Sequence, residues 1–310
     1  MSASSIATGA FIVNYHQTAW QIKKQDKEAK SAVVEKYQTD PGAVKVEKFL
    51  IDKNAPEIRM IGKLAGEARL FHYKNTLPYA DNGRLLPAAN YEPYKTGMTE
   101  RKIAYFEAVD HFCTRYEALI DEYTTKLGNL KNRSEYPSIT EIRDKFGFDV
   151  SFNPVPDITH FTISWLDEME RKAIISEALT RKETAEKEAM ADLWKRLYKP
   201  VSHMAEKLSD PEGIFQDSLV ENIAELVDLL PRLDFSSDPA LTRMTDIIKE
   251  RLLKYDPKTL RLDKAARKET AETAKTIAAG FKKMGKDKIE VPRPAMTIVG
   301  GFTRVGTVIM

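Results

Sequence analysis

Apolar residues recur at intervals of three and four over three long stretches of this sequence, and this spacing limits the possible folds more than any other feature. Residues 99–130 have the longest such series: Ile103, Phe106, Val109, Phe112, Cys113, Tyr116, Leu119, Ile120 and Tyr123. This spacing places apolar side chains on one face of an α-helix. Residues 166–204 and 213–230 repeat it. We predict long helices, of which the highly charged one at 166–204 forms a helical bundle or a coiled-coil arm.

Three short segments predict β-strands instead. Residues 10–20 are rich in β-branched and aromatic residues, residues 146–152 alternate apolar and polar side chains, and residues 160–165 follow a turn with two prolines. We expect the last two to form a hairpin that the first strand joins, because a lone hairpin is only marginally stable in water. The predicted fold class is therefore α+β, with predominantly long α-helices and a small antiparallel β-sheet.

The remaining segments complete a prediction of three regions. We expect helices at 23–38, at 43–71 with a break near Pro56, at 241–255 and at 265–284, and an irregular loop over 72–98, which holds three prolines and an Asn-Gly pair. Pro200 is expected to bend or break the helix at 166–204, and Gly300-Gly301 to form the turn of a C-terminal hairpin. The regions are an α+β domain at 1–165, a helical bundle or arm at 166–290 and a tail at 291–310.

Composition excludes several classes of protein. Of the 310 residues, 42% are hydrophobic, as in ordinary globular proteins, and the single Cys113 leaves no intrachain disulfide. No apolar run approaches the ~18 residues that span a bilayer, and no basic segment precedes an apolar one near the N-terminus. We expect a cytoplasmic protein without a membrane partner.

Charge is distributed unevenly along the chain. The formal net charge is +2 overall, and by segment it is +5 over residues 1–102, −11 over 103–248 and +8 over 249–310. Basic ends can contact a polyanion, or they can pair with the acidic middle of the same or a neighbouring subunit. Ordinary solvated helix faces of uneven charge would give the same pattern, so these interpretations stay open.

The sequence contains none of the common catalytic or metal-binding motifs. Its five histidines are far apart, there is no cysteine pair, and neither a Gly-x-x-x-x-Gly-Lys-Ser/Thr loop nor a Gly-x-Ser-x-Gly turn is present. We therefore expect no metal, no cofactor and a protein that is not an enzyme. An active site assembled from distant residues without a motif stays open, because catalytic residues have no fixed order along a chain.

Residues 69–102 are the one segment whose composition indicates a ligand. They carry six Lys or Arg against three Asp or Glu, interleaved with tyrosines. Cations that contact phosphates beside rings that stack on bases are typical of proteins that bind single-stranded nucleic acid. The candidate residues are Arg69, Lys74, Arg84 and Lys95 for phosphate, and Tyr73, Tyr79, Tyr91 and Tyr94 for stacking. Alternatively, the tyrosines pack the segment onto helices and the cations stay solvated.

The C-terminal helix at 265–284 is also basic. The cations in and beside it are Lys264, Arg267, Lys268, Lys275, Lys282 and Lys283. Side chains of this kind add sequence-independent contacts to phosphate.

Three stretches resemble a group of phage-encoded proteins. They are RLFHYKNTLPYADNGRLLPAANYEPY at 69–94, FGFDVSFNPVPD at 146–157 and LLPRLDFSSDPAL at 229–241. The first is similar to an aromatic HY…TLP(W/Y)…LP..NY pattern of that group. The group has no assigned function, so the resemblance implies only a phage or mobile-element origin and a role outside housekeeping metabolism.

Two functional hypotheses follow. The first is a non-enzymatic phage protein that binds nucleic acid, single-stranded DNA above all, as an oligomer. The second is a helical protein-interaction module, such as an adaptor, an assembly subunit or an inhibitor of a host factor, that acts through its acidic residues 103–248. Self-association through the helical arm is compatible with both.

Overall fold

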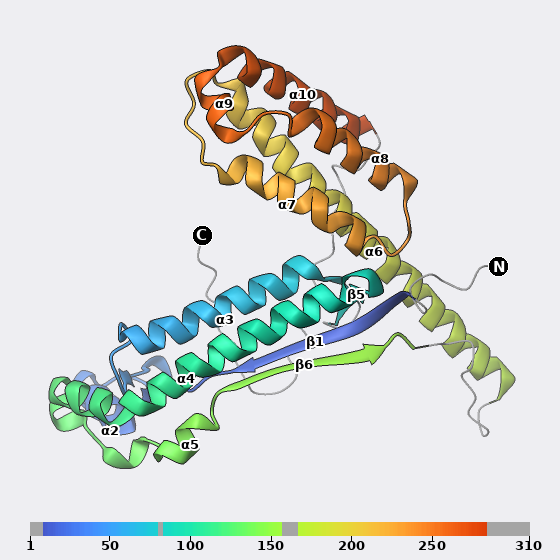
Figure 1. Ribbon diagram of the computed structural model, residues 1–310. Helices are drawn as coiled ribbons and strands as arrows, with labels where there is room; N and C mark the ends of the chain where they lie inside the picture. The colour runs from blue at the N-terminus through green and yellow to red at the C-terminus, as the bar shows by residue number, and fades with distance from the viewer. Residues whose placement is uncertain (1–8, 80–82, 157–166, 284–310) are drawn as a thin grey trace. The chain divides into compact units, whose positions relative to one another are not determined.

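The computed structural model describes residues 9–79, 83–156 and 167–283 and has an α+β fold dominated by helices (Figure 1). The strands are β1 (Ala10–Thr18), β2 (Lys23–Gln25), β3 (Glu47–Phe49), β4 (Leu77–Pro78), β5 (Arg84–Pro87) and β6 (Gly147–Pro154). The α-helices are α2 (Lys27–Tyr37), α3 (Pro56–Asn75), α4 (Tyr91–Leu127), α5 (Ile139–Arg143), α6 (Glu168–Ser209), α7 (Ser218–Leu233), α8 (Pro239–Ile247), α9 (Pro257–Leu262) and α10 (Lys264–Lys283). The predicted strand at 160–165 and the C-terminal hairpin lie outside the described residues.

The chain divides into two compact units that are each discontinuous in sequence. The sheet unit comprises residues 13–76 and 88–153, and the bundle unit comprises the described residues of 1–12, 77–87 and 154–310. A four-stranded sheet has the order β4-β5-β1-β6, and β2 pairs with β3 in a separate antiparallel ribbon. This division differs from the predicted boundary at residue 165, because the short hairpin of β4 and β5 belongs with the later helices.

In the sheet unit, β1 and β6 lie where the alternation predicts them. Along β6, Phe148 is buried while Asp149 and Ser151 are exposed, as expected of a strand with one covered face. The expected helix at 43–55 is wrong, because residues 47–49 form β3 against β2. This short ribbon is held by Lys48, whose buried ammonium lies 2.7 Å from Asp26 and 2.9 Å from Glu135.

The predicted loop at 72–98 is largely regular structure. Helix α3 continues to Asn75, β4 and β5 form an antiparallel hairpin, and α4 begins at Tyr91, eight residues before the predicted start. Pro93 does not prevent this early start, since a proline in the first helical turn removes an amide that would have no intrahelical partner. The side chain of Asn90 donates to the Asn75 carbonyl at 2.9 Å and so joins the end of α3 to the start of α4.

Aromatic rings form the core of the sheet unit. The side chains of Tyr94, Tyr105, Phe112 and Tyr116 on α4 are completely buried. Ring pairs join them to the sheet and to the preceding loop: Tyr105 with Phe148, Phe112 with Phe146, and Tyr116 with Trp20. Most of the aromatic residues of this unit therefore stabilise its fold.

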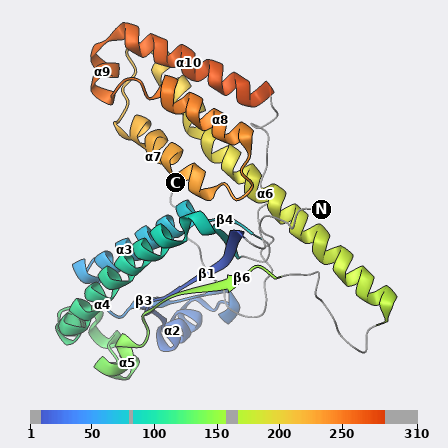
Figure 2. The same ribbon diagram turned by 45° about the vertical axis from the view of Figure 1, so that its right-hand side comes forward.

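The bundle unit is built on α6, with α7 and α10 packed against it and α8 packed against α7 (Figure 2). Helix α10 runs antiparallel to α6, since Phe281 contacts Trp194 and Tyr198 while Arg267 donates to the carbonyls of Asp210 and Gly213. Of the two effects expected of Pro200, a bend or a break, the break is wrong, because α6 continues through it to Ser209. Residues 248–252 extend α8 as a short π-helix, and α9 was not predicted.

Candidate nucleic-acid interface

The structure distributes the eight predicted ligand-binding residues over both units. Arg69, Tyr73 and Lys74 lie on the last turns of α3, and Tyr91, Tyr94 and Lys95 on the first turn of α4, all in the sheet unit. Tyr79 and Arg84 belong to the bundle unit. Within one unit, therefore, at most six of the eight residues can form a common surface.

Tyr94 is part of the core. Its side chain is completely buried, its hydroxyl lies 2.7 Å from Nδ1 of the buried His72, and its ring stacks on Phe71. A base cannot reach this ring in the described conformation. The packing alternative for the tyrosines therefore applies to Tyr94, and a ligand-binding role for it has no support in the structure.

Tyr79 also packs inward. It lies partly buried against the hydrophobic core of the bundle unit, and burial raises the pKa of its hydroxyl, with a smaller contribution from the nearby Glu186 carboxylate. Tyr91 is half-buried and packs edge-on against Phe152 of β6, with the Lys95 ammonium 5.5 Å from its ring centre. These contacts leave little of either ring for stacking.

The surface that remains of the predicted site is small. Arg69, Lys74 and Lys95 are exposed, and half of the Tyr73 side chain reaches solvent beside His72. Arg69 is near enough to Tyr15 of β1 to lower its pKa, although burial has the larger effect and raises it. Tyr91 and Lys95 instead lie beside β6. The aromatic residues between Arg69 and Lys95 thus pack the end of α3 and the start of α4 together, and exposed cations surround this packed region.

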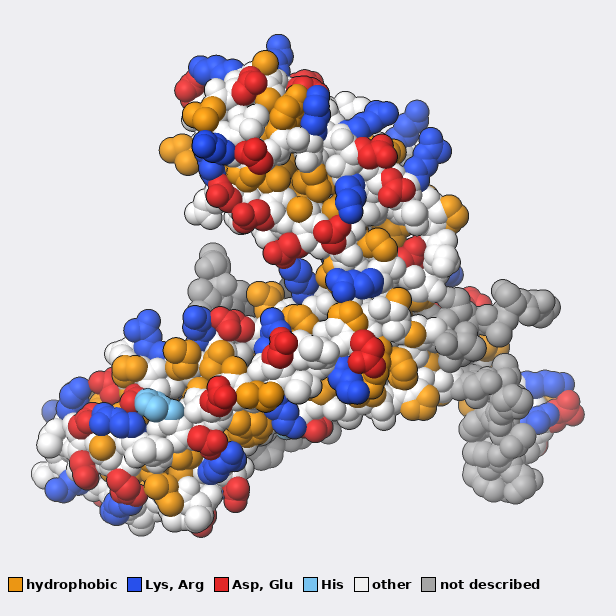
Figure 3. Space-filling view, viewed as in Figure 1, with side chains coloured by type: hydrophobic (Ala, Val, Ile, Leu, Met, Phe, Trp, Pro, Cys, Tyr) orange, Lys and Arg blue, Asp and Glu red, His pale blue; other side chains and the backbone are white. Residues whose placement is uncertain are grey.

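A second basic surface lies in the bundle unit, in a groove between α6 and α10. The groove has a volume of about 510 Å³, and the residues that line it are Ser202, Ala205, Glu206, Ser209, Lys275, Ala278, Ala279 and Lys282. Most of these side chains are small, so the backbones and the lysine stems form its walls. Figure 3 shows Lys and Arg side chains gathered over the end of α10.

Exposed or partly exposed lysines lie along both of the helices that form this groove. On α10, Lys268, Lys275 and Lys282 are exposed and seven residues apart, which places them on one face. On α6, the residues Lys195, Lys199, Ser202, Glu206 and Ser209 follow one another at alternating intervals of four and three. They therefore share one face of the helix. Of these lysines, Lys275 and Lys282 line the groove, and Lys275 also pairs with Glu272 at 2.9 Å. The α6 side of the groove consists of Ser202, Ala205, Glu206 and Ser209, so its cations come from α10.

Two of the cations expected in this region have structural roles. Arg267 is buried, and its guanidinium donates to the Asp210 and Gly213 carbonyls at 2.6 Å, which holds the turn after α6. Lys264 pairs with Glu212 at 2.9 Å. The expected phosphate contact of Arg267 is therefore wrong, because its guanidinium already binds backbone carbonyls. The lysines on α10 were predicted from the sequence. The α6 residues that form the other side of the groove could not be placed beside them from sequence alone.

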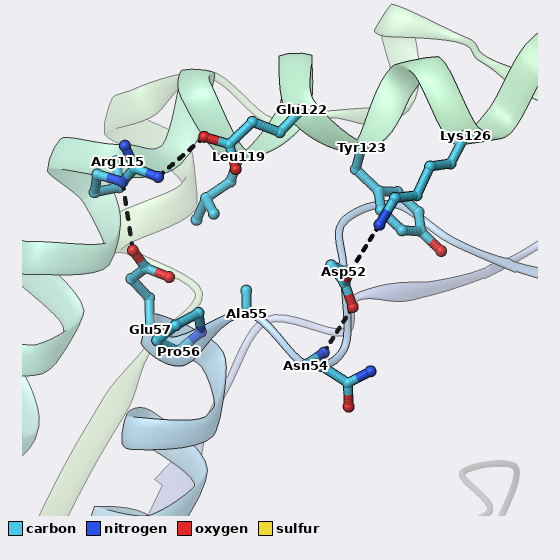
Figure 4. Close-up of a pocket in the computed structure, with 10 residues that line it drawn as sticks. All are labelled: Asp52, Asn54, Ala55, Pro56, Glu57, Arg115, Leu119, Glu122, Tyr123 and Lys126. Carbon is cyan, nitrogen blue, oxygen red and sulfur yellow. Dashed lines mark hydrogen bonds and ion pairs between the residues drawn. The ribbon is translucent and has the colours of Figure 1, made fainter.

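A small pocket of the sheet unit lies between the start of α3 and the second half of α4 (Figure 4). Its volume is about 270 Å³. Arg115 bridges Glu57 and Glu122, and Lys126 contacts Asp52 at 3.1 Å. The Asn54 amide and Lys126 hold the pKa of Asp52 below its usual value. All five charged side chains of the lining take part in these ion pairs, so this pocket offers no activated acid, base or nucleophile.

The described part of the chain gives no indication of a metal or membrane site. Within it, no group of three or more His, Cys, Asp or Glu side chains could hold a metal ion. The helices of that part include none long and apolar enough to cross a membrane. Burial raises the pKa of the half-buried Cys113 thiol, which keeps it protonated. His160 lies outside the described residues.

No family model, curated protein or solved structure matches this chain. The resemblance to phage-encoded proteins, and the phage origin that it implies, therefore stay predictions.

Proposed function

We propose that the protein binds nucleic acid, single-stranded DNA above all, and that the groove between α6 and α10 is the principal contact. The observation that carries this proposal is the groove beside α10, which Lys275 and Lys282 line and where the exposed Lys268 continues the same seven-residue spacing. Lysine ammonium groups contact phosphates as point charges and gain free energy by releasing counterions from the nucleic acid.

The dimensions of the groove favour one strand. Lysines seven residues apart lie about 10 Å apart along a helix, so Lys268, Lys275 and Lys282 can contact phosphates at intervals along one backbone. Packed helices have axes about 8–10 Å apart, so a groove between them admits a single backbone more readily than a duplex. A duplex would contact only the lysine tips.

The groove lacks a stacking ring. Tyr198, the nearest aromatic side chain of α6, packs against Phe281 in the core. Contacts made by lysine alone position a strand without reading its bases. We therefore expect binding that is independent of sequence. Arg69, Tyr73 and Lys74 in the sheet unit stay proposed as a secondary contact, in which Tyr73 is the tyrosine most accessible to a base.

The test is fluorescence anisotropy of a labelled single-stranded oligonucleotide across a salt series, with Lys275→Glu/Lys282→Glu as the variant. Arg243→Glu/Lys258→Glu is the matched control, since it makes the same charge change at exposed positions of the same unit outside the groove. We expect steep salt dependence, with each lost phosphate contact lowering the logarithmic salt slope by about 0.7. Only the groove variant should bind weakly. If both variants lose the same affinity, net charge rather than the groove determines binding, which would contradict the proposal. Absence of binding at low salt would also refute it.

The protein-interaction hypothesis has one specific observation in its favour. Leu70 on α3 is 70% exposed and Ile103 on α4 is 56% exposed, and large apolar side chains are seldom so accessible without a partner. The acidic stretch 103–248 divides between the two units, with residues 103–153 in the sheet unit and residues 154–248 in the bundle unit. A protein partner that Leu70→Lys/Ile103→Lys releases in a pull-down at high salt would favour this function.

A further inference from the structure

The bundle unit has a second hollow, where the last turns of α6 meet the start of α7 (Figure 1). It is a pocket of about 380 Å³, closed on its third side by the loop between the two helices. This volume lies at the lower end of the ~300–1,000 Å³ that is typical of small-molecule sites. Its apolar lining comprises Phe215, Leu219 and Ile214, and the last of these is 92% exposed, so the pocket has an apolar rim that a ligand can cover.

The polar side chains of this pocket are not engaged with the rest of the protein. They are His203, Lys207, Gln216, Ser218 and Asn222. Within the part of the chain that the structure describes, none of these five side chains makes a hydrogen bond or an ion pair. The pocket of the sheet unit differs, because each charged side chain of its lining is ion-paired. Convergent polar groups that have no internal partner are available to a ligand.

The charge around the pocket favours an anion. Among the described residues, the lining includes Lys207 and no Asp or Glu. The buried guanidinium of Arg267 lies 5.4 Å from the centre of the Phe215 ring, directly behind this lining residue. Its hydrogen bonds go to backbone carbonyls, and among the described residues it forms no ion pair. A buried charge without a counter-charge is unfavourable, so an anion in the pocket would be attracted to it.

Two arginines hold the loop that forms the floor of the pocket. Arg267 donates to the carbonyls of Asp210 and Gly213 at 2.6 Å. Arg261 of α9 donates to the carbonyl of Phe215 at 3.2 Å. These bonds order the loop before a ligand arrives, which lowers the entropic cost of binding.

We propose that this pocket binds a nucleoside monophosphate, with its phosphate at Lys207 and His203. These two residues are one turn apart on the same face of α6, so both can donate to one phosphate group. On the opposite side, the amides of Gln216 and Asn222 offer donors and acceptors together, as the edge of a base requires. The apolar lining faces the flat ring of the base. The proposal concerns a free nucleotide, so it does not rest on the groove between α6 and α10.

Isothermal titration calorimetry with the four nucleoside 5′-monophosphates, without nucleic acid, tests this site. We expect at least one of them to bind, and its unphosphorylated nucleoside and inorganic phosphate each to bind at least about tenfold more weakly. Inorganic phosphate that binds as tightly as the nucleotides would overturn the proposed base contacts. Absence of binding by all four at millimolar concentration would overturn the whole proposal, and it would leave the result of the single-stranded DNA titration unaffected.

Variants locate the binding in the pocket. Lys207→Gln should weaken the nucleotide at least about tenfold, and Gln216→Ala/Asn222→Ala should weaken it by a similar factor. Lys258→Gln is the matched control, since it removes the same charge from an exposed position of the same unit outside the pocket. All of the changed side chains are exposed, so the urea midpoint should stay constant. Equal affinity in Lys207→Gln and the parent protein, or equal loss in the control, would contradict this site.

Discussion

The two units each contain an antiparallel helix pair, and the two pairs are packed in different ways. In the sheet unit, α3 and α4 meet through rings: Phe71 stacks on Tyr94 and lies against Gly97. In the bundle unit, α6 and α10 meet through Phe281 against Trp194 and Tyr198 at one end, and alanines line the rest, where a groove remains beside Lys275 and Lys282. The pair with aromatic and basic residues in its sequence buries its rings, while the pair with small residues keeps its cations accessible. An aromatic-basic composition thus indicates a ligand only where the rings are not needed for packing.

Tyr94→Ala gives the largest expected effect on this comparison. Removing a completely buried ring from the core should lower the free energy of unfolding by about 3–5 kcal/mol. Tyr73→Ala, at the edge of the same cluster where its ring packs edge-on against His72, should change it much less, since half of that side chain is already in solvent. Urea unfolding followed by circular dichroism measures both. Similar values for the two variants would contradict the assignment of Tyr94 to the core.

Gly97→Ala should come next. A Cβ atom at this position would lie 2.3 Å from the Phe71 ring, so the two helices would have to separate, and we expect a loss of about 1–3 kcal/mol. Gly66→Ala on α3 is the matched control, because a Cβ atom there meets nothing within 4 Å. It should stabilise the helix by up to about 1 kcal/mol. Thermal unfolding should therefore shift in opposite directions, and a shift in the same direction would show that ring packing does not set the helix separation.

The stability of the two units should also depend differently on pH in the acidic range. The hydrogen bond from Lys48, followed by that from the Ala29 amide, lowers the pKa of the buried Asp26 carboxyl, the N-cap of α2. This group therefore stabilises the sheet unit above its unfolded pKa of about 3.9 and loses that contribution as pH falls through its lower folded value. Asp26→Asn keeps the cap but not the charge, and should lose about 1–3 kcal/mol at pH 7.

The variant should also lose less further stability on acidification than the parent protein does. Urea midpoints measured between pH 7 and pH 3 give both quantities. The exposed pair of Lys264 and Glu212 in the bundle unit supplies the contrast, since Glu212→Gln should shift the midpoint little at any pH in this range. A parent protein whose stability is constant over this range would refute the role of Asp26.

Lys282→Met should have the smallest effect on folding. The side chain is exposed at the groove, so the free energy of unfolding should change by less than about 0.5 kcal/mol. Lys282→Met should weaken binding to single-stranded DNA without changing the urea midpoint. Variants in the tyrosine cluster should instead change binding and stability together. Loss of stability would instead assign Lys282 a structural contact.

The sequence predicts those elements whose evidence is local. Alternation along β1 and β6 and the three-and-four spacing in α4, α6, α7 and α10 were sufficient to place them. The segment at 72–98 was misjudged because its contacts are distant: Tyr91 packs on Phe152, and Pro93 is tolerated only because α4 begins just before it. For the candidate interface, heptad-spaced lysines on α10 are visible in the sequence, whereas their neighbours on α6 follow only from antiparallel packing.

The two-unit division also has a consequence for the order in which the chain becomes complete during synthesis. The polypeptide passes between the units four times, and the hairpin at 77–87 belongs to a core whose helices are made later. Leu77 and Leu85 are completely buried among residues that include those of α6 and α7. At about 5–20 residues per second, these leucines wait roughly seven to thirty seconds on the ribosome before α7 is finished. The nascent hairpin is thus an apolar segment that a chaperone has time to bind.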